Sequence, residues 1–425
     1  MEKIRAILIG AGIRGKTYTD YAKDFHDDRF ELVAVAEPDA GRRAAVQQKH
    51  GIAPENCVSD WSELLCRPKF ADAAIIATQD RQHFVPAMKA IELGYNLLLE
   101  KPMAVTPEEC IRIADYADEM GVEVMVCHVL RFTPFFKRVK EVIDSGMLGE
   151  IVNIIHVEAV GDRHYAHSYT RGNWNNLEKS SPMILAKCSH DMDILQWLVG
   201  KKCTRVHSFG ALRHFKKENC PEGAPYRCIE GCPHADTCPY DAVRTYLKEK
   251  ERAKHATGVF EPSDEDIVKA LRESPYGVCV YQSDNDVVDH QTVNLEFEGG
   301  ALVSFTMSAF NKGGRFIRIM GTKGEATAYM NEDKIRVFDF LTRETVEVPI
   351  LNAELNETIF GGHGGGDKGI VQAFVELMHG TYTGNGLSDG VTCAENHLMA
   401  FAAEESRVTG KVIDMKEYIA SFRKS

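Results

Sequence analysis

The sequence predicts an α/β fold that begins with a parallel sheet covered by helices. Three observations predict it: five short apolar runs within residues 1–126, amphipathic stretches between them, and a glycine-rich turn directly after the first run. Apolar runs that alternate with helical patterns are typical of a doubly wound parallel sheet. The expected strands are Ile4 to Ile9, Leu32 to Ala36, Ala73 to Ala77, Asn96 to Leu99 and Val122 to Val126.

The glycine-rich turn follows the first expected strand without a break. Gly10, Gly12 and Gly15 are spaced as G-x-G-x-x-G, which indicates a dinucleotide-binding turn when it lies between a strand and a helix. The first glycine adopts angles closed to other residues, the second lets the chain approach a pyrophosphate, and the third lets helix and strand pack closely. Ile13 and Arg14 lie inside the motif, so we expect them at the cofactor. The sequence therefore predicts a Rossmann domain here, with a purely structural turn as the alternative.

An acidic residue ends the second expected strand. Glu37 lies about 20 residues beyond the glycine turn, where a carboxylate accepts hydrogen bonds from both ribose hydroxyls of an adenosine. A carboxylate there repels a 2′-phosphate, so NAD is favoured over NADP. Arg42 and Arg43 lie close in sequence and leave NADP open.

Polar side chains also cluster where the third and fourth expected strands end. Thr78, Asp80 and His83 follow the third strand, and Glu100 and Lys101 follow the fourth. In open α/β sheets, ligands bind at the edge formed by the carboxyl ends of the strands. We therefore expect these five residues to line the cofactor site.

Length and composition indicate a two-domain enzyme. The chain has 425 residues, more than one hydrophobic core usually serves, and 44% of them are hydrophobic. No apolar stretch approaches the roughly 20 residues that span a bilayer, and no apolar signal segment opens the chain, so we expect a soluble cytoplasmic protein that binds no membrane. The formal net charge of −12 argues against a nucleic-acid partner.

The motifs together resemble the Gfo/Idh/MocA family of NAD(P)-dependent sugar and cyclitol oxidoreductases. The hallmark of that family is Glu-Lys-Pro, present here as Glu100, Lys101 and Pro102. The resemblance implies a second α/β domain over residues 127–425 with a large, mostly antiparallel sheet whose open face covers the nicotinamide and substrate. It also implies a homodimer or homotetramer. Further landmarks are the glycine turn, Thr78 to His83, Arg131 to Pro134, the histidine-bearing helix near residue 190 and Gly321 to Glu325.

The implied chemistry needs a group that polarises a hydroxyl and a base that takes its proton. The Lys101 ammonium suits the first role, and burial after a strand could lower its pKa enough to pass protons. His190 suits the second, because an imidazole titrates near neutral pH. The alternatives without a catalytic role are that Lys101 is a surface lysine paired with Glu100 and that His190 is a core histidine hydrogen-bonded to the backbone.

The segment from Ser181 to Trp197, expected to be one helix, departs from the family's D-x-G-x-H-x-x-D pattern. His190 and Asp193 match it, but Ala186 replaces the aspartate and Cys188 replaces the glycine. Lys187 and Asp191 add charges that the pattern lacks. On one helix they would lie four residues apart, pair with each other and flank His190. We therefore expect both to join a rewired acid–base relay.

Several other polar residues are expected at the substrate. Sugars bind by stacking on aromatic rings while fixed polar groups read the hydroxyls, which favours the donor-rich stretch around Trp174. A glycine-rich turn could bring His363 and Asp367 to a ligand, although Asp367 could simply cap a helix. The expected substrate residues are Arg131, His167, Arg171, Trp174, Asp193, His290, His363 and Asp367.

A cysteine-rich insertion over about residues 215–275 carries a separate signal. Cys220, Cys228, Cys232 and Cys238 fall within 19 residues as C-x7-C-x3-C-x5-C. Clustered thiolates in a cytoplasmic chain more often bind metal than form disulfides. We favour structural zinc; an iron–sulfur cluster and unliganded thiols remain alternatives, because the spacing lacks the tight C-x2-C pairs of common zinc modules.

Three functions are consistent with the sequence. The leading hypothesis is an NAD-dependent dehydrogenase that removes hydride from a secondary hydroxyl of a sugar, cyclitol or glycoside. The second is redox-neutral glycoside cleavage, in which transient oxidation permits elimination and the hydride then returns, so that NAD is not consumed. The third is a non-catalytic regulator that senses a sugar and NAD, because Ala186 stands where the family pattern has an aspartate.

Overall fold

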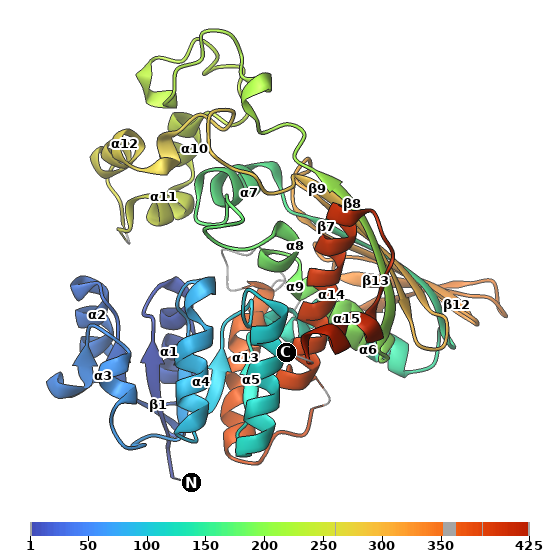
Figure 1. The fold of residues 1–425 in the computed structure, drawn as a ribbon. Helices are drawn as coiled ribbons and strands as arrows, with labels where there is room; N and C mark the ends of the chain where they lie inside the picture. The colour runs from blue at the N-terminus through green and yellow to red at the C-terminus, as the bar shows by residue number, and fades with distance from the viewer. Residues whose placement is uncertain (1, 260, 352–362, 385, 424–425) are drawn as a thin grey trace.

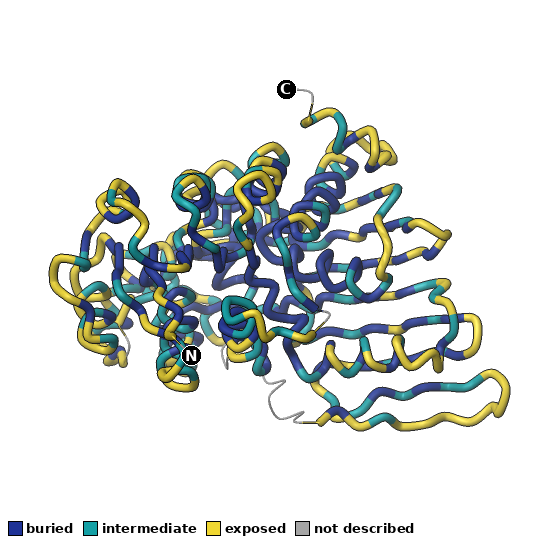
Figure 2. Tube along the Cα trace, turned by 90° about the horizontal axis from the view of Figure 1, so that it is seen from below, coloured by how far each residue is buried: buried dark blue, intermediate teal, exposed yellow. Residues whose placement is uncertain are grey.

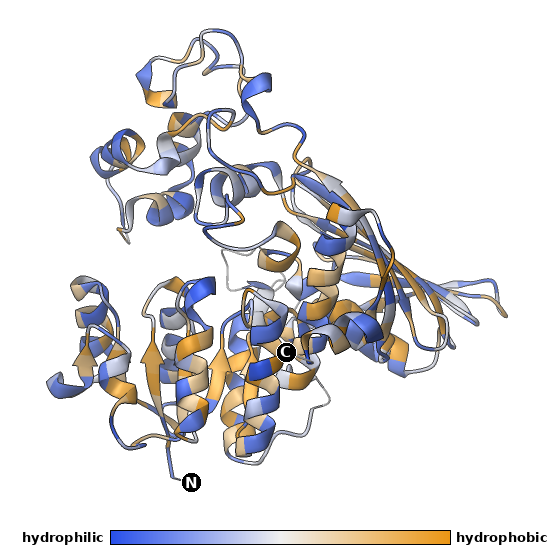
Figure 3. Ribbon diagram, in the orientation of Figure 1, coloured by the Kyte–Doolittle hydropathy of each residue, from blue (hydrophilic) through white to orange (hydrophobic). Residues whose placement is uncertain are grey.

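A computed structural model describes residues 2–259, 261–351, 363–384 and 386–423. Its first sheet has six parallel strands in the order β3-β2-β1-β4-β5-β6. This arrangement confirms the predicted Rossmann sheet, and the apolar strands stand out in Figure 3. The strands are β1 (Ile4–Ile9), β2 (Phe30–Ala36), β3 (Cys57–Val58), β4 (Ala73–Ile76), β5 (Asn96–Leu99) and β6 (Val124–Val126).

Helices from both ends of the chain cover this sheet. The glycine turn leads into α1, and the late helix α13 packs beside it and shares its apolar core. Residues far beyond the sheet therefore complete its layers, and Figure 1 shows the orange-red α13 among the blue helices of this domain. The helices are α1 (Ile13–His26), α2 (Ala40–His50), α3 (Ser62–Leu65), α4 (Phe84–Glu92), α5 (Pro107–Met120) and α13 (Gly366–Met378).

The second sheet is large and mostly antiparallel, as the family resemblance implied. Its nine strands run in the order β14-β13-β12-β11-β7-β10-β9-β8-β15, and only β7 and β10 pair in parallel among the described residues. The strands are β7 (Ile151–Ala159), β8 (Cys203–Ala211), β9 (His290–Phe297), β10 (Leu302–Ser308), β11 (Gly314–Gly321), β12 (Gly324–Tyr329), β13 (Lys334–Asp339), β14 (Thr345–Pro349) and β15 (Ile413–Asp414).

Helices cover one face of the second sheet and connect it to the first. Helix α14 packs against β8, α5 and α9, so it joins the two sheets, and Figure 2 shows a continuous buried interior there. No helix of the described residues combines the length and apolar character needed to cross a membrane. The helices are α6 (Pro134–Asp144), α7 (Asp162–Tyr165), a π-helix (Ala166–Arg171), α8 (Met183–Ala186), α9 (Ser189–Val199), α14 (Gly390–Thr409) and α15 (Met415–Phe422).

The insertion stands apart from both sheets. It contains α10 (Ala242–Lys248), α11 (Lys250–Thr257) and α12 (Asp264–Glu273), which share a small apolar core that includes Tyr246 and Leu271. The cysteine-bearing loop before α10 holds only short 3-10 turns and forms the outermost part of the molecule in Figure 1. The loop thus lacks the apolar core that the helices after it possess.

Candidate active site

The glycine turn has the shape expected of a dinucleotide cradle. Gly10 has φ 91°, and a Cβ there would lie 2.6 Å from the Ala77 carbonyl oxygen. No atom of the described residues stands within 4 Å of the position that a Gly12 Cβ would take, which leaves room there for a pyrophosphate. A Cβ on Gly15 would collide with the backbone of the turn. Free backbone N–H groups at the start of α1 then face this space.

Glu37 lies at the end of β2 beside this turn. Its carboxylate accepts hydrogen bonds from the backbone N–H of Ala11 at 2.7 Å and of Asp39 at 3.0 Å. These two bonds fix a buried carboxylate next to the glycine turn, which is the position that ribose recognition needs. The Arg43 side chain donates to the backbone carbonyls of Glu37 and Pro38, so it is already engaged.

The polar residues His83 and Asp80, which follow β4, have different roles. The ring of the buried His83 lies between the carbonyl oxygens of Pro102, at 2.7 Å, and Thr78, at 3.2 Å, and thereby joins the ends of β4 and β5. Asp80 is buried and accepts a hydrogen bond from the indole N–H of Trp174 at 3.0 Å. His83 is therefore a scaffold residue, whereas Asp80 supplies charge to the site.

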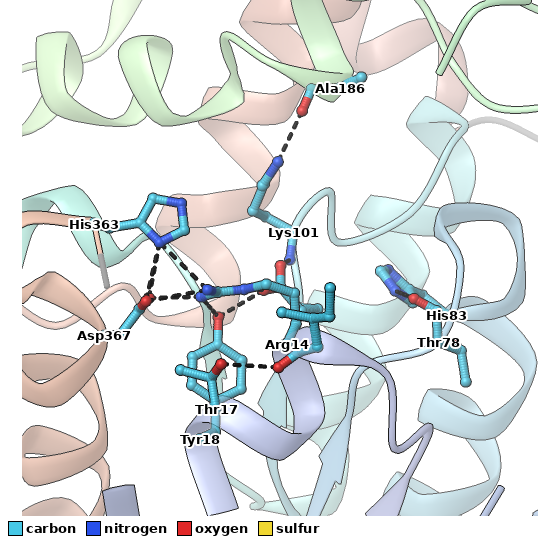
Figure 4. Close-up of polar contacts among 11 residues, drawn as sticks. Arg14, Thr17, Tyr18, Thr78, His83, Lys101, Ala186, His363 and Asp367 are labelled. Carbon is cyan, nitrogen blue, oxygen red and sulfur yellow. Dashed lines mark hydrogen bonds and ion pairs between the residues drawn. The ribbon is translucent and has the colours of Figure 1, made fainter. Parts of the chain in front are cut away.

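A buried ionic cluster fixes the start of the Glu-Lys-Pro segment. Arg14 donates to Glu100 at 2.8 Å and to Asp367 at 2.6 Å, and Asp367 also contacts His363 at 3.0 Å (Figure 4). Tyr18 donates to Glu100 at 2.6 Å. Burial would raise the pKa of Glu100, but the charges of Arg14 and Lys101 outweigh it and hold the pKa below its usual value. The cluster therefore links the glycine turn, the end of β5 and α13.

Lys101 extends from this cluster toward the second domain. Its Nζ donates to the carbonyl oxygen of Ala186 at 2.8 Å, as Figure 4 shows. Burial lowers the pKa of Lys101, and the negative charges of Glu100 and Asp80 offset part of that effect. The Lys101 side chain thus places its charged ammonium group at the interface between the two sheets.

His190 is buried close to that ammonium. Only 4% of the residue is exposed, and its Nδ1 has no hydrogen-bond partner in the described structure. Its ring lies 5.5 Å from that of His128 and 6.2 Å from that of His363, measured between centroids. Burial, then the charge of Lys101, holds the pKa of His190 well below its ordinary value. The imidazole is therefore uncharged at pH 7.

Lys187 and Asp191 do not form the predicted pair. The expected helix from Ser181 to Trp197 is broken into α8 and α9, because Cys188, the second of the two residues between them, leaves helical geometry with ψ 6°. Lys187 instead faces Glu158 at 3.3 Å, while Asp191 binds Arg315 at 2.9 Å.

The sequence reasoning missed the partners in this network. Asp191 also accepts a hydrogen bond from His156 at 2.8 Å, and Arg315 bridges to Glu158 at 2.7 Å. Burial would raise the pKa of Asp191, but Arg315 and His156 hold it below its usual range. His156 and Glu158 lie two residues apart on β7, so their side chains share one face of the strand. A strand predicted over these residues would have indicated that the two side chains lie together.

Arg131 and Asp193 bind each other rather than face a ligand. The guanidinium donates to both carboxylate oxygens, at 2.7 and 2.6 Å, and Asn396 donates to the same carboxylate at 2.8 Å. Both residues are buried, with 3% and 0% exposed. The pair ties α9 to α14 and to the segment after β6, and contact of either residue with substrate stays a prediction.

Three more expected substrate residues take partners away from Lys101. His167 contacts the hydroxyl of Tyr246 at 2.7 Å, in the insertion. Arg171 donates to the carbonyl oxygens of Tyr240 and Val278. His290 contacts its neighbour Asp289 at 2.7 Å. In this structure, His167 and Arg171 hold the insertion, while Trp174 and His363 remain beside the site through Asp80 and His190.

The insertion cysteines gather only in part. Cys228, Cys232 and Cys238 line a small cavity together with Cys279, which lies outside the four predicted metal ligands. Cys220 does not line it. All five are free thiols. Zinc on the four predicted cysteines stays a prediction.

Comparison with known proteins agrees with the fold and the glycine turn. Residues 4–128 match the model of the oxidoreductase family with an NAD-binding Rossmann fold, and residues 136–327 match the GFO/IDH/MocA C-terminal domain. The putative oxidoreductase YteT of Bacillus subtilis (strain 168) is 23% identical over 382 residues, which cover 86% of this chain and 87% of YteT.

Two partial relatives have named activities. Inositol 2-dehydrogenase of Corynebacterium glutamicum is 26% identical, with 48% of this chain and 57% of that protein covered. The 2,7-anhydro-N-acetylneuraminate hydratase of Mediterraneibacter gnavus is also 26% identical, with 47% and 50% covered. The chain thus spans little more than half the length of these two relatives.

Solved structures share the whole architecture. Levoglucosan dehydrogenase, in a complex with NADH and levoglucosan, superimposes with a TM-score of 0.69 at 18% identity over 97% of this chain and 100% of that one. At that identity the likeness establishes the fold alone. The two family models, which follow each other along the chain, decide the assignment: this protein belongs to the Gfo/Idh/MocA family of NAD-dependent oxidoreductases.

Proposed function

We propose that the protein is an NAD-dependent dehydrogenase that oxidises a secondary hydroxyl of a sugar, cyclitol or glycoside. One observation carries the proposal: the buried Nδ1 of His190 has no hydrogen-bond partner among the described residues, and the Lys101 ammonium, which donates to Ala186, is near enough for its charge to lower the pKa of that imidazole. A buried nitrogen without a partner costs about 1–3 kcal/mol, so it is retained where a ligand satisfies it.

NAD fits the residues at this edge. Gly12 leaves space for the pyrophosphate, α1 offers N–H groups, and Glu37 stands where the ribose hydroxyls bind. A bound nicotinamide would supply the hydride acceptor. The acid at position 37 favours NAD over NADP as the coenzyme.

The side chains supply the proton chemistry. Lys101 donates a hydrogen bond to the substrate hydroxyl and stabilises the negative charge that develops on its oxygen. His190 accepts the hydroxyl proton at its Nδ1, which has no hydrogen-bond partner among the described residues. Lys187 pairs with Glu158, and Asp191 pairs with Arg315. These ion pairs balance the buried charges around the site. In reverse, His190 returns the proton to the alkoxide oxygen.

Steady-state reduction of NAD with a panel of polyols, aldoses and glycosides tests the proposal. We expect NADH to accumulate in proportion to the oxidised product. Failure of every secondary alcohol in the panel to reduce NAD, in a protein that binds NAD, would contradict it.

Redox-neutral cleavage is the second candidate, favoured by the relative that is a hydratase. Release of aglycone without net NADH would support it, and net NADH with an intact glycoside would exclude it. The near-complete burial of His190 is what a sensing role would also show, but the unpartnered Nδ1 favours direct contact with a ligand.

We propose further that the enzyme assembles as a homodimer or homotetramer through the open face of the second sheet. Several large apolar side chains are exposed on its strands, which is unusual for a free surface. They are Ile155, Phe209, Leu302 and Tyr329. The mass of the particle in solution, measured by light scattering, tests this assembly. A metal on the insertion would take no part in hydride transfer and would serve the fold.

A further inference from the structure

His363 stands in a backbone conformation that costs energy. Its φ of 49° lies in the left-handed region, although its neighbours in the chain, Gly362 and Gly364, are both glycines. The only other described residue besides glycine with a positive φ is Arg343, in the connection between β13 and β14. A side chain in this region carries a steric cost that glycine avoids. Residues held in such conformations gather at active sites, so the position of this histidine calls for a functional reason.

The carboxylate of Asp367 sets the direction of this imidazole. Asp367 is buried at the start of α13, and its two oxygens lie 3.0 and 3.1 Å from the Nδ1 of His363. Arg14 also approaches this nitrogen, at 3.3 Å, but binds the same carboxylate more closely, at 2.6 Å. When Nδ1 donates its proton to Asp367, the other ring nitrogen, Nε2, carries a free lone pair. Figure 4 shows that second nitrogen on the side of the ring away from Asp367.

His363 and His190 form a pair of imidazoles near Lys101. Their ring centroids lie 6.2 Å apart. After burial, the charge of Lys101 and, more weakly, that of His363 lower the pKa of His190. A base works within about 3 Å of the atom that gives up its proton, so two bases at this separation reach neighbouring atoms of one bound sugar ring. Oxidation of a hydroxyl needs only one of them, which leaves the second imidazole available for a second proton.

The two imidazoles differ in how they stabilise a positive charge. The Nδ1 of His190 has no hydrogen-bond partner among the described residues, whereas the Nδ1 of His363 faces the Asp367 carboxylate. A carboxylate on the far nitrogen stabilises the imidazolium that forms when a histidine takes a proton. Burial lowers the pKa of His363, and the charge of Asp367 offsets part of that effect. His363 is therefore equipped for the more difficult of two proton transfers.

We propose that His363 is a second base, which removes a proton from the carbon next to the one that is oxidised. The inference rests on the proposed function, because the ketone formed by oxidation makes that neighbouring C–H bond acidic. The C–H bond breaks and its proton passes to the Nε2 of His363. The electron pair of that bond forms a carbon–carbon double bond, and the π pair of the carbonyl moves to its oxygen, whose negative charge Lys101 stabilises. Return of the proton restores the ketone.

This step gives the site an activity beyond dehydrogenation. The imidazolium of His363 exchanges its proton with solvent, so the hydrogen on the neighbouring carbon is exchanged as well. Where the next carbon carries an oxygen substituent, the enolate re-forms the carbonyl and expels that substituent with the electron pair of its C–O bond. The leaving oxygen then takes the proton that His363 holds. The favoured substrates are therefore cyclic sugars or glycosides with an oxygen substituent two carbons from the oxidised one.

Deuterium uptake by recovered alcohols tests the proposal. The full chain is incubated in deuterium oxide with NAD and each polyol or glycoside of the panel, among them myo-inositol and methyl glucosides. The carbon-bound hydrogens of these alcohols do not exchange on their own, so uptake requires oxidation, exchange and return of the hydride. We expect nuclear magnetic resonance to find deuterium on the carbon next to the oxidised one, with or without net NADH.

The two proposals fail in different ways in this experiment. NADH formation without deuterium uptake would overturn the role of His363 and leave the dehydrogenase standing. Neither NADH nor deuterium with any member of the panel would contradict both.

His363→Asn tests whether this imidazole is the base, because asparagine tolerates the left-handed region and cannot take the proton. We expect deuterium uptake to fall at least about 100-fold while NADH formation stays within about fivefold. His379→Asn, the matched control directly after α13, should behave as the unmodified protein. Unchanged uptake in His363→Asn would overturn the proposal, as would loss of NADH formation with NAD affinity retained. Should His363→Asn lose NAD affinity through misfolding, His363→Gln is measured in its place against the same expectations.

Discussion

Replacement of Lys101 by methionine tests the proposed chemistry most directly. The change keeps the length of the side chain and removes the ammonium that donates to Ala186 at 2.8 Å. At a contact distance of about 3 Å and an effective dielectric constant of about 20, one such charge stabilises an oxyanion by about 5.5 kcal/mol. Glu100 and Asp80 offset part of that field. We therefore expect a net loss of about 3–4 kcal/mol, or a fall of 10²–10³-fold in kcat.

Steady-state kinetics with NAD and the best substrate of the panel would measure this loss. NAD affinity should change little, because Arg14 rather than Lys101 holds Glu100. Lys89→Met is the matched control, since Lys89 is partly exposed and pairs with Glu92 on α4; its kcat should stay within a factor of two. A fall of less than tenfold in Lys101→Met would refute the polarising role.

The same variant has a spectroscopic consequence. The charge of Lys101 is, after burial, the next largest cause of the depressed pKa of His190. Its removal should raise the pKa of that imidazole, which nuclear magnetic resonance can follow through the ring protons. An unchanged His190 titration would show that the two side chains do not share one site.

Three further predictions test the cofactor site and the buried charges. Glu37→Ser should weaken NAD binding by about 10–100-fold, because charged hydrogen bonds contribute about 1.5–3 kcal/mol, and should leave NADP binding nearly unchanged; fluorescence titration measures both. Asp193→Asn should lower the free energy of unfolding by about 3–5 kcal/mol, since it leaves Arg131 buried without its counter-ion, and unchanged urea unfolding with a raised KM would contradict the structural role. Burial lowers the pKa of His167 and of His397 to about 3; the unfolded chain therefore binds more protons below about pH 6.5, and stability is lost as the pH falls through that value, by about 2 kcal/mol per histidine at pH 5. Equal urea midpoints at pH 7 and pH 5 would disprove this last prediction.

The first sheet was predictable because its information is local. A run such as Ile4 to Ile9 is apolar on both faces, as a strand between two helical layers requires, and the glycine turn after it constrains the backbone directly. The two-residue strand β3 has no such pattern and was missed. Local sequence patterns therefore predict the longer strands and the edge of the sheet that binds the cofactor. They do not predict a strand as short as β3.

The charged network around α9 was not predictable in the same way. Asp191 takes Arg315 as its partner across 124 positions in sequence, on a strand of the second sheet. The four-residue spacing to Lys187 favoured a helical pair, but that inference required one continuous helix. The break at Cys188 turned the lysine to Glu158 instead. Cys279 was missed for the same reason, because its neighbours in the cavity lie in another segment.

The substitution at position 186 decides which group can act as the base. The family pattern has an aspartate there, whereas this chain has Ala186, whose backbone carbonyl accepts the hydrogen bond of Lys101. A carbonyl oxygen can orient an ammonium but cannot hold a proton at neutral pH. The nearby acids Asp191 and Glu158 both face the Arg315 guanidinium, which balances their charge and favours their ionised forms. A proton leaving the substrate hydroxyl therefore passes to His190, whose neutral ring and unpartnered Nδ1 are suited to receive it.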